Sequence, residues 1–168
     1  MVLAVPLSVT TNGTTAVRFF TTFTDYMAPT AAEVNAVSMK ELSCYITGDG
    51  LNTDAQENTV TDDRLCSQQT FEQPGDHTRT LELTYIMNPA SSANDVARTT
   101  LAIGTQGYIG IRWGVLADNA WAAGDKVDIY PVKAGAQRRI TPGRNGIHKI
   151  IQKFYITGKL ADMVAVAA

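Results

Sequence analysis

The sequence predicts a mainly β protein: an antiparallel sandwich or barrel of about seven or eight strands with one flanking α-helix. Three observations support this fold class. From Arg79 to Met87 apolar and polar residues alternate, which is the two-residue period of a strand with one buried face. Threonine, alanine and valine are plentiful, and β-branched residues favour strands. Strand-like runs also follow one another with turns between them, whereas a parallel sheet would alternate them regularly with helices.

The first third of the chain predicts two strands, a short helix and a long loop. Residues 15–23 (TAVRFFTTF) are aromatic and β-branched and predict the first strand. Thr30 with Glu33 three residues later forms a capping-box pattern, which predicts a short helix to about Ala36. Residues 40–47 predict the second strand. The polar residues 48–63 (GDGLNTDAQENTVTDD) predict a long loop, and such a loop in a compact domain is usually functional or disordered.

Residues 65–89 (LCSQQTFEQPGDHTRTLELTYIMNP) predict a β-hairpin. The turn is expected at residues 73–76 (QPGD), because proline presets φ and glycine allows a positive φ. In the second strand Leu81, Leu83, Tyr85 and Met87 share one face, and the polar residues point the other way. Pro89 is expected to end that strand, because proline cannot continue a hydrogen-bonded ladder.

The second half predicts the flanking helix and three further strands. Ser92 is expected to cap a helix that runs to about Ile103 and ends at Gly104. The strands are expected at residues 107–115, 126–133 and 147–157, with a basic loop at residues 134–146 (AGAQRRITPGRNG). The core or intersubunit packing is assigned to Leu81, Leu83, Tyr85, Ile109, Ile111, Trp113, Phe154 and Ile156, whereas Trp121 is placed in a loop.

Length and composition indicate one globular domain spanning residues 1–168. The net charge of −2 excludes a protein that wraps nucleic acid with a basic surface. The apolar N-terminus lacks the basic segment of a signal peptide, and no apolar run approaches the ~20 residues of a membrane span. A cytosolic origin is therefore expected, in which Cys44 and Cys66 are more often two thiols than a disulfide.

No catalytic or metal-binding motif is recognisable. His77 lies in or beside a turn and His148 at the start of a strand, and neither has a cysteine or carboxylate at metal-ligand spacing. Residues 49–54 weakly resemble a calcium loop, but the glycine is misplaced and no bidentate glutamate follows at the required position. The sequence therefore predicts neither an enzyme nor a cofactor.

Two oppositely charged segments stand out. The predicted basic loop carries Arg138, Arg139 and Arg144, which can serve as a solvated surface or meet phosphates. They can also pair with the acidic segment 48–63 of a neighbouring copy, and head-to-tail contacts of that kind make rings or filaments. The acidic residues of that segment are Asp49, Asp54, Glu57, Asp62 and Asp63.

Several blocks in order carry a resemblance to a known family. They are DDRLCSQQTFEQPGDHTRTLELTYIMNP, a helix with an acidic start, GYIGIRWG, DKVDIYPV and KIIQKFYITG. Together they resemble the major tail tube proteins of long, non-contractile-tailed bacteriophages, most closely those of phages that infect actinobacteria. The resemblance covers most of the chain, and it is weakest in the N-terminal arm (1–12) and in the polar segment 48–63.

The resemblance implies a β-sandwich with a flanking helix that assembles into hexameric rings. In that family the rings stack into a hollow tube around a tape-measure protein, and the genome later passes through the tube. The implied partners are further copies of the chain, the tape-measure protein, the tail terminator and distal-tail proteins, and DNA in transit without specific binding. The implied location is the virion tail, after assembly in the host cytoplasm and without a membrane.

The resemblance also suggests roles for particular surfaces. A polar strand face is expected to line the lumen, and because fixed cations would retain DNA, it should be neutral or acidic. The candidate lumen residues are Gln68, Glu72, Thr80, Glu82 and Thr84. Segment 48–63 corresponds to the long loop that reaches an adjacent ring, with Arg138, Arg139 and Arg144 as complementary contacts. Residues 1–12 and 159–168 are expected to be arms that clasp neighbours.

Two other functions remain open from the sequence. A tail-completion or distal-tail protein would form a single ring and stop. A monomeric β-sandwich module would bind a small ligand or glycan, but a glycan reader usually presents several exposed aromatic side chains close together.

Overall fold

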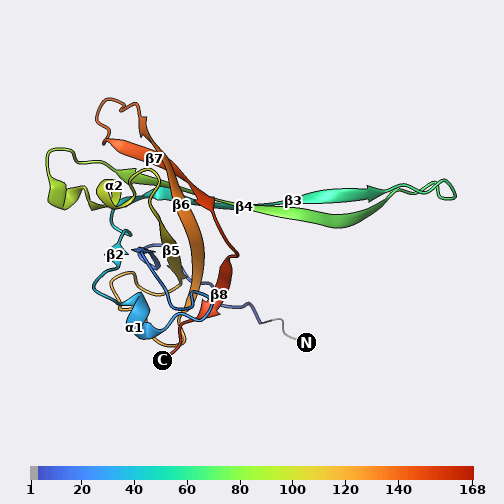
Figure 1. The fold of residues 1–168 in the computed structure, drawn as a ribbon, viewed down its shortest axis with the longest axis horizontal. Coiled ribbons are helices and arrows are strands. Elements are labelled where there is room, and N and C mark those ends of the chain that lie inside the picture. The colour runs from blue at the N-terminus through green and yellow to red at the C-terminus, as the bar shows by residue number, and fades with distance from the viewer. Residues whose placement is uncertain (1–3) are drawn as a thin grey trace.

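The computed structural model describes residues 4–168 and contains one antiparallel sheet of eight strands (Figure 1). The strands follow the order β2-β1-β5-β6-β7-β4-β3, and β8 pairs with β6 outside that path. The predicted fold class is confirmed, because the protein is mainly β, antiparallel and has two short α-helices. The strands are β1 (Thr15–Phe20), β2 (Lys40–Glu41), β3 (Ile46–Asp62), β4 (Phe71–Ile86), β5 (Gln106–Trp113), β6 (Lys126–Ile140), β7 (Lys149–Ile156) and β8 (Ala161–Ala165).

The helices are short. The first, α1 (Ala31–Val34), has the predicted capping box: Thr30 accepts a hydrogen bond from the Glu33 backbone, and the Glu33 carboxylate accepts one from Thr30. The predicted helix at residues 92–103 is instead a 3₁₀ turn, η1 (Ser92–Asn94), followed by α2 (Val96–Thr100). The Ser92 side chain does not cap a helix, and Asp95 lies between η1 and α2.

The larger hydrophobic core lies on one face of a curled sheet. It contains Val17 from β1 and Leu83 from β4, although three strands separate β1 from β4 in the sheet order. The Leu42 N–H donates to the Val17 carbonyl and the Ile86 N–H to the Tyr45 carbonyl, so segment 42–45 joins both strands and the sheet curves until they approach each other. Leu101, the residue that follows α2, packs into the same core. Of the assigned core residues, Leu81, Leu83, Tyr85, Ile109, Ile111 and Phe154 are buried and Ile156 is partly buried.

A second hydrophobic cluster covers the opposite face of β6. Val127 and Ile129 contribute from β6, Ala161 from β8 and Trp121 from the β5–β6 connection. Trp121 lies in a connection, as predicted, but it is buried, whereas Trp113, assigned to the core or to intersubunit packing, is not part of the core of its own chain. Trp121 is 1% exposed, whereas Trp113 is 37% exposed and uses its indole N–H to donate to Asp128 over 2.7 Å.

Trp121 is fixed by two arginines. The guanidinium groups of Arg18 and Arg112 lie 4.8 and 5.6 Å from the centroid of its ring. Arg112 is fully buried and donates to three backbone carbonyls of the β5–β6 connection and to Asp125. The composition of this connection, polar and small, explains why sequence patterns did not place Trp121 in the core.

Two segments predicted as loops, and the C-terminal tail predicted as a clasping arm, are largely strand. Residues 48–63 belong mostly to β3, and residues 134–140 extend β6 through Arg138 and Arg139. Residues 161–165 form β8, so the C-terminal segment is part of the sheet of its own chain. Conversely, residues 40–47 hold only the two-residue β2 and the start of β3. Residues 4–12 are exposed and have no regular structure except for a turn that begins at residue 12. Positions 1–3 of the predicted N-terminal arm lie outside the described residues.

Candidate assembly interface

The β3–β4 hairpin extends far beyond the rest of the molecule (Figure 1). Its root is anchored by Leu81, Leu83 and Tyr85, all buried, and by the pairing of β4 with β7. Beyond the root, residues 52–78 form what we call the arm, in which no residue is buried. Eleven residues separate Leu51 from Asp62, which corresponds to about 36 Å of strand.

The turn of the hairpin differs from the predicted one. Residues 73–76 lie within β4, where Pro74 pairs with Thr59. A β-bulge next to them, between the Glu57 and Thr59 pairs, accommodates the extra residue of β4. A Cβ atom on Gly75 would lie 2.8 Å from the Asn58 carbonyl oxygen, so this close approach requires glycine. The proline–glycine pair therefore marks a bulge rather than a chain reversal.

The chain actually reverses at residues 63–70, which we call the tip. The Ser67 N–H donates to the Arg64 carbonyl over 3.0 Å, so Leu65 and Cys66 occupy the two central positions of a tight turn. The Arg64 guanidinium binds both carboxylate oxygens of Asp62 at 2.7 Å, and this lowers the pKa of that carboxyl group. Leu65 and Cys66 are exposed, and Gln68 lies here rather than on a strand.

The register divides the predicted lumen residues between two faces. Glu82 pairs with Asn52 and Thr80 with Asp54, so these residues share a face with Thr84. Glu72 pairs with Thr61, which lies an odd number of residues along β3 from Asn52. Because side chains alternate along a strand and the bulge adds its extra residue to β4, Glu72 points to the opposite face from Glu82.

The sheet face that carries Glu82 is rich in cations. Glu82 pairs across the strands with Lys153, and the Arg138 guanidinium lies 3.3 Å from its carboxylate. The register adds Lys149 and Lys133 to the same face. The pattern of the hairpin residues does not reveal these lysines, because they reach this face from β6 and β7.

The remaining predicted charged residues are dispersed. Asp49 lies at the hairpin root, where a hydrogen bond from Thr47, assisted by its own backbone and by Lys149, lowers its pKa. Arg139 is the penultimate residue of β6 and Arg144 lies in the β6–β7 connection, and neither forms an ion pair within the described residues. The structure thus does not gather Arg138, Arg139 and Arg144 into one loop. Cys44 and Cys66 are both free and exposed.

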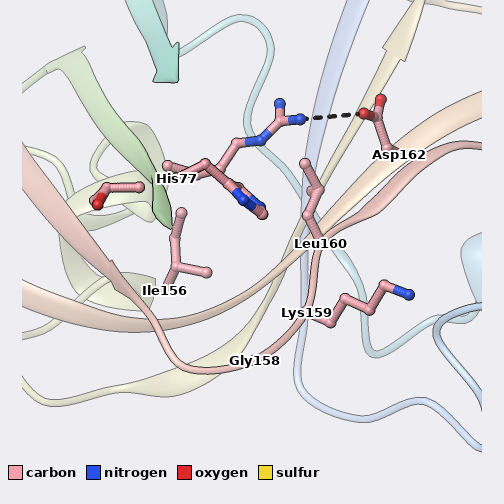
Figure 2. A pocket seen from close by; sticks show the side chains of 8 residues that line it. His77, Ile156, Gly158, Lys159, Leu160 and Asp162 are labelled. Carbon is pink, nitrogen blue, oxygen red and sulfur yellow. Dashed lines mark hydrogen bonds and ion pairs between the residues drawn. The ribbon is translucent and has the colours of Figure 1, made fainter. Parts of the chain in front are cut away.

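A cleft of about 470 Å³ opens where the arm leaves the rest of the molecule (Figure 2). Ile156 and Leu160 supply its apolar part, and Lys159 lies at its margin. Arg79 crosses it to Asp162 at 3.4 Å, an exposed and therefore weak ion pair. We call this the basic cleft; its lining residues are His77, Thr78, Arg79, Ile156, Gly158, Lys159, Leu160 and Asp162.

A second cleft, of about 630 Å³, lies between the N-terminal segment, the β3 root and the end of β5. Val17, Leu51 and Trp113 give it an apolar lining, and Cys44 lies at it as well. Neither cleft contains a cluster of potential metal ligands, and none was found elsewhere among residues 4–168. Among residues 4–168, no helix is long and apolar enough to cross a membrane.

Comparison with known proteins supplies the family. The model of a family described as phage tail tube protein matches residues 3–168, nearly the entire chain. No curated protein sequence matches significantly.

Among solved structures, the chain resembles one from the baseplate of the anti-feeding prophage, determined by cryo-electron microscopy with six-fold symmetrisation. The TM-score is 0.54 at 9% identity, with 94% of this chain and 97% of the other covered. At that identity the likeness concerns the fold alone. The match of the family model is what decides the assignment: the chain belongs to the phage tail tube protein family, whose members are structural components of the virion tail rather than enzymes.

Proposed function

We propose that the chain polymerises into stacked, hexameric rings that form a hollow tube around a tape-measure protein and later conduct DNA. The observation that carries this proposal is the arm, which lies outside the core of its own chain along its entire length. A two-stranded hairpin is marginally stable in water by itself, so an arm of this length calls for a partner. In a polymer of identical subunits, that partner is another copy.

The comparison structure supports a six-membered ring, because the baseplate that contains it was symmetrised six-fold. The same fold in a ring-shaped tail assembly is compatible with the ring that the tail tube family implies. Terminator and distal-tail proteins would close the two ends of such a tube, and assembly would take place in the host cytoplasm.

Electron microscopy of the purified protein tests the proposal. Negatively stained samples at increasing concentration should show tubes or stacked rings, and thin sections of infected cells should show tubes of the same diameter. A protein that remains monomeric at every salt and protein concentration, with no tubes in infected cells, would refute it. Single rings that never stack would favour a tail-completion or distal-tail role instead.

Within the tube, the face that carries Thr80, Glu82 and Thr84 is the proposed lumen wall. Lys133, Arg138, Lys149 and Lys153 outnumber the acidic residues Glu82 and Asp54 on this face. The proposed wall would therefore be more positive than the neutral or acidic wall expected from the sequence. Glu82→Lys should leave the tubes intact and slow DNA delivery, because a further cation would retain phosphates. If phage carrying Glu82→Lys delivered DNA at the normal rate, this face would not line the lumen.

The acidic residues of β3 and the tip are proposed to contact a neighbouring copy. Arg138 and Arg139 were the expected complementary residues, and their joint reversal to glutamate should block polymerisation without unfolding the subunit. Reversing Arg138 also breaks its ion pair with Glu82 in the same chain, so a loss of assembly in that variant would have two possible causes. Arg139→Glu alone is therefore the cleaner variant, and unchanged polymerisation would exclude Arg139 as a contact.

A further inference from the structure

The charge of the molecule is divided unequally between the arm and the remainder. Residues 52–78 carry six acidic and only one basic side chain, although the chain as a whole has a net charge of only −2. The remainder therefore has a net charge of +3. Opposite charges on two parts of one molecule favour contacts in which the arm of one copy meets the remainder of another.

The tip of the arm has two features that are available for contact with a partner. Leu65 occupies the apex and is fully exposed at 111%, far from the core of its own chain. Asp63 is exposed beside it and makes no ion pair within the described residues, whereas Asp62 is engaged by Arg64. The tip thus presents one apolar side chain next to one available carboxylate.

The basic cleft matches this pair of features. Ile156 and Leu160 form an apolar floor, and Lys159 stands exposed at its margin without an ion-pair partner among residues 4–168 (Figure 2). Arg79 is held only by its weak pair with Asp162. A leucine can therefore lie against the floor while an adjacent carboxylate meets a lysine.

The tip of the same chain cannot occupy this cleft. Seven residues of β4 separate Thr78, which lines the cleft, from Phe71, where the strand begins, and they span about 23 Å. The arm is paired along that length and leads away from the cleft (Figure 1). Only a second copy can supply the tip.

We propose that the basic cleft receives the tip of another copy, with Leu65 against Ile156 and Leu160, and Asp63 paired with Lys159. This inference rests on the proposed polymer and identifies the acceptor surface for the arm. It differs from the pairing with Arg138 and Arg139, which lie outside the cleft lining, and Arg138 already contacts Glu82. Because tip and cleft are different surfaces, the contact is head-to-tail and can repeat without limit.

Charge reversal tests the ion pair. Lys159→Glu should raise the protein concentration at which tubes appear by about tenfold or more, because the reversed charge repels Asp63. Lys159→Arg should assemble like the unaltered protein, and combining Lys159→Glu with Asp63→Lys should restore assembly. Lys40→Glu, at the far edge of the sheet on β2, is the matched control.

Crosslinking tests the proximity directly. In a Cys44→Ser background the only thiol is Cys66 at the tip, and Thr78→Cys adds one in the cleft lining at a residue that the proposed ion pair does not use. A short bismaleimide should join successive copies into ladders on denaturing gels when tubes are present, and should give no dimer at concentrations below assembly. Lys40→Cys in the same background should give few crosslinks.

The two proposals fail separately. If the unaltered protein forms no tubes, the proposed function fails. If it forms tubes but Lys159→Glu assembles at the same concentration, and Cys66 crosslinks to position 78 no better than to position 40, the acceptor assignment is wrong. Circular dichroism and thermal melting of the variants exclude misfolding as the cause of lost assembly.

Discussion

The arm and the remainder of the molecule, here called the body, are built from the same antiparallel strands but are stabilised differently. In the body, Trp121 is enclosed between Arg18 and Arg112, and the larger core draws side chains from five strands and the end of α2. In the arm, cross-strand hydrogen bonds are present but no residue is buried. Backbone pairing therefore gives the arm its shape, whereas side-chain burial gives the body its stability.

Removing the arm should separate assembly from folding most completely. Replacing residues 54–80 by Asn-Gly joins Thr53 directly to Leu81, its pairing partner, through a two-residue turn. We expect complete loss of tubes and a folded monomer, because the deleted residues bury nothing. Size-exclusion chromatography and electron microscopy measure the first effect, and thermal melting the second. Unfolding of the shortened chain would contradict the division into arm and body.

Trp121→Ala should have the largest effect on the free energy of unfolding of the monomer. Large-to-small substitutions of a buried aromatic side chain cost about 3–5 kcal/mol, and this one also removes the ring that both arginines contact. Chemical denaturation below the assembly concentration measures it. Trp113→Phe is a suitable comparison, because Trp113 is partly exposed and loses mainly its hydrogen bond to Asp128. Equal losses for both variants would be inconsistent with the buried position of Trp121.

A matched pair of leucines sharpens the comparison within one hairpin. Leu83→Ala at the root removes a fully buried side chain and should cost about 2–5 kcal/mol of monomer stability. Leu65→Ala at the tip should change monomer stability by less than about 0.5 kcal/mol while weakening assembly. Denaturation of the monomer and the concentration threshold for tubes are the two measurements. A stability loss from Leu65→Ala would mean that the tip contacts its own chain.

The smallest expected effect concerns the capping box of α1. Backbone hydrogen bonds from Thr24 and Thr30 to the Glu33 carboxylate lower its pKa from 4.5 to about 2. A lowered folded-state pKa adds stability that is complete above pH 4.5 and lost as the pH falls toward 2. Glu33 is partly exposed, so we expect about 1 kcal/mol, the usual value of a cap. Glu33→Gln should reduce this acid-dependent loss, as monitored by denaturation at several pH values.

Sequence patterns located the parts of the fold that depend on local chemistry. The alternation of Leu81, Leu83 and Tyr85 identified the buried face of β4, and the Thr30–Glu33 pattern identified the cap. The polar composition of residues 48–63 predicted a loop, but most of them belong to β3. A strand without a buried face lacks the apolar alternation by which strands are recognised. Pro74–Gly75 has the composition of a turn but forms a bulge, and only pairing with β3 distinguishes the two.

The candidate assembly surfaces were predictable only in part. The acidic character of segment 48–63 is evident from its composition, and the structure places most of it on the arm. The basic cleft joins β4 with the β7–β8 connection, which are about 80 residues apart in sequence, so no local pattern indicates it. The cations near Glu82 were missed for the same reason, since Lys153 and Arg138 reach that face through sheet order.

The Pro74 bulge makes the arm a poor template for edge-to-edge pairing with another strand. An exposed two-stranded ribbon presents open edges that can recruit similar ribbons into disordered aggregates. Pro74 lacks one backbone donor, the bulge interrupts the regular ladder, and the excess of carboxylates makes identical arms repel each other. Side-by-side fusion of arms into a continuous sheet is thereby disfavoured. For the proposed polymer, this would keep unassembled copies apart until a growing end accepts them.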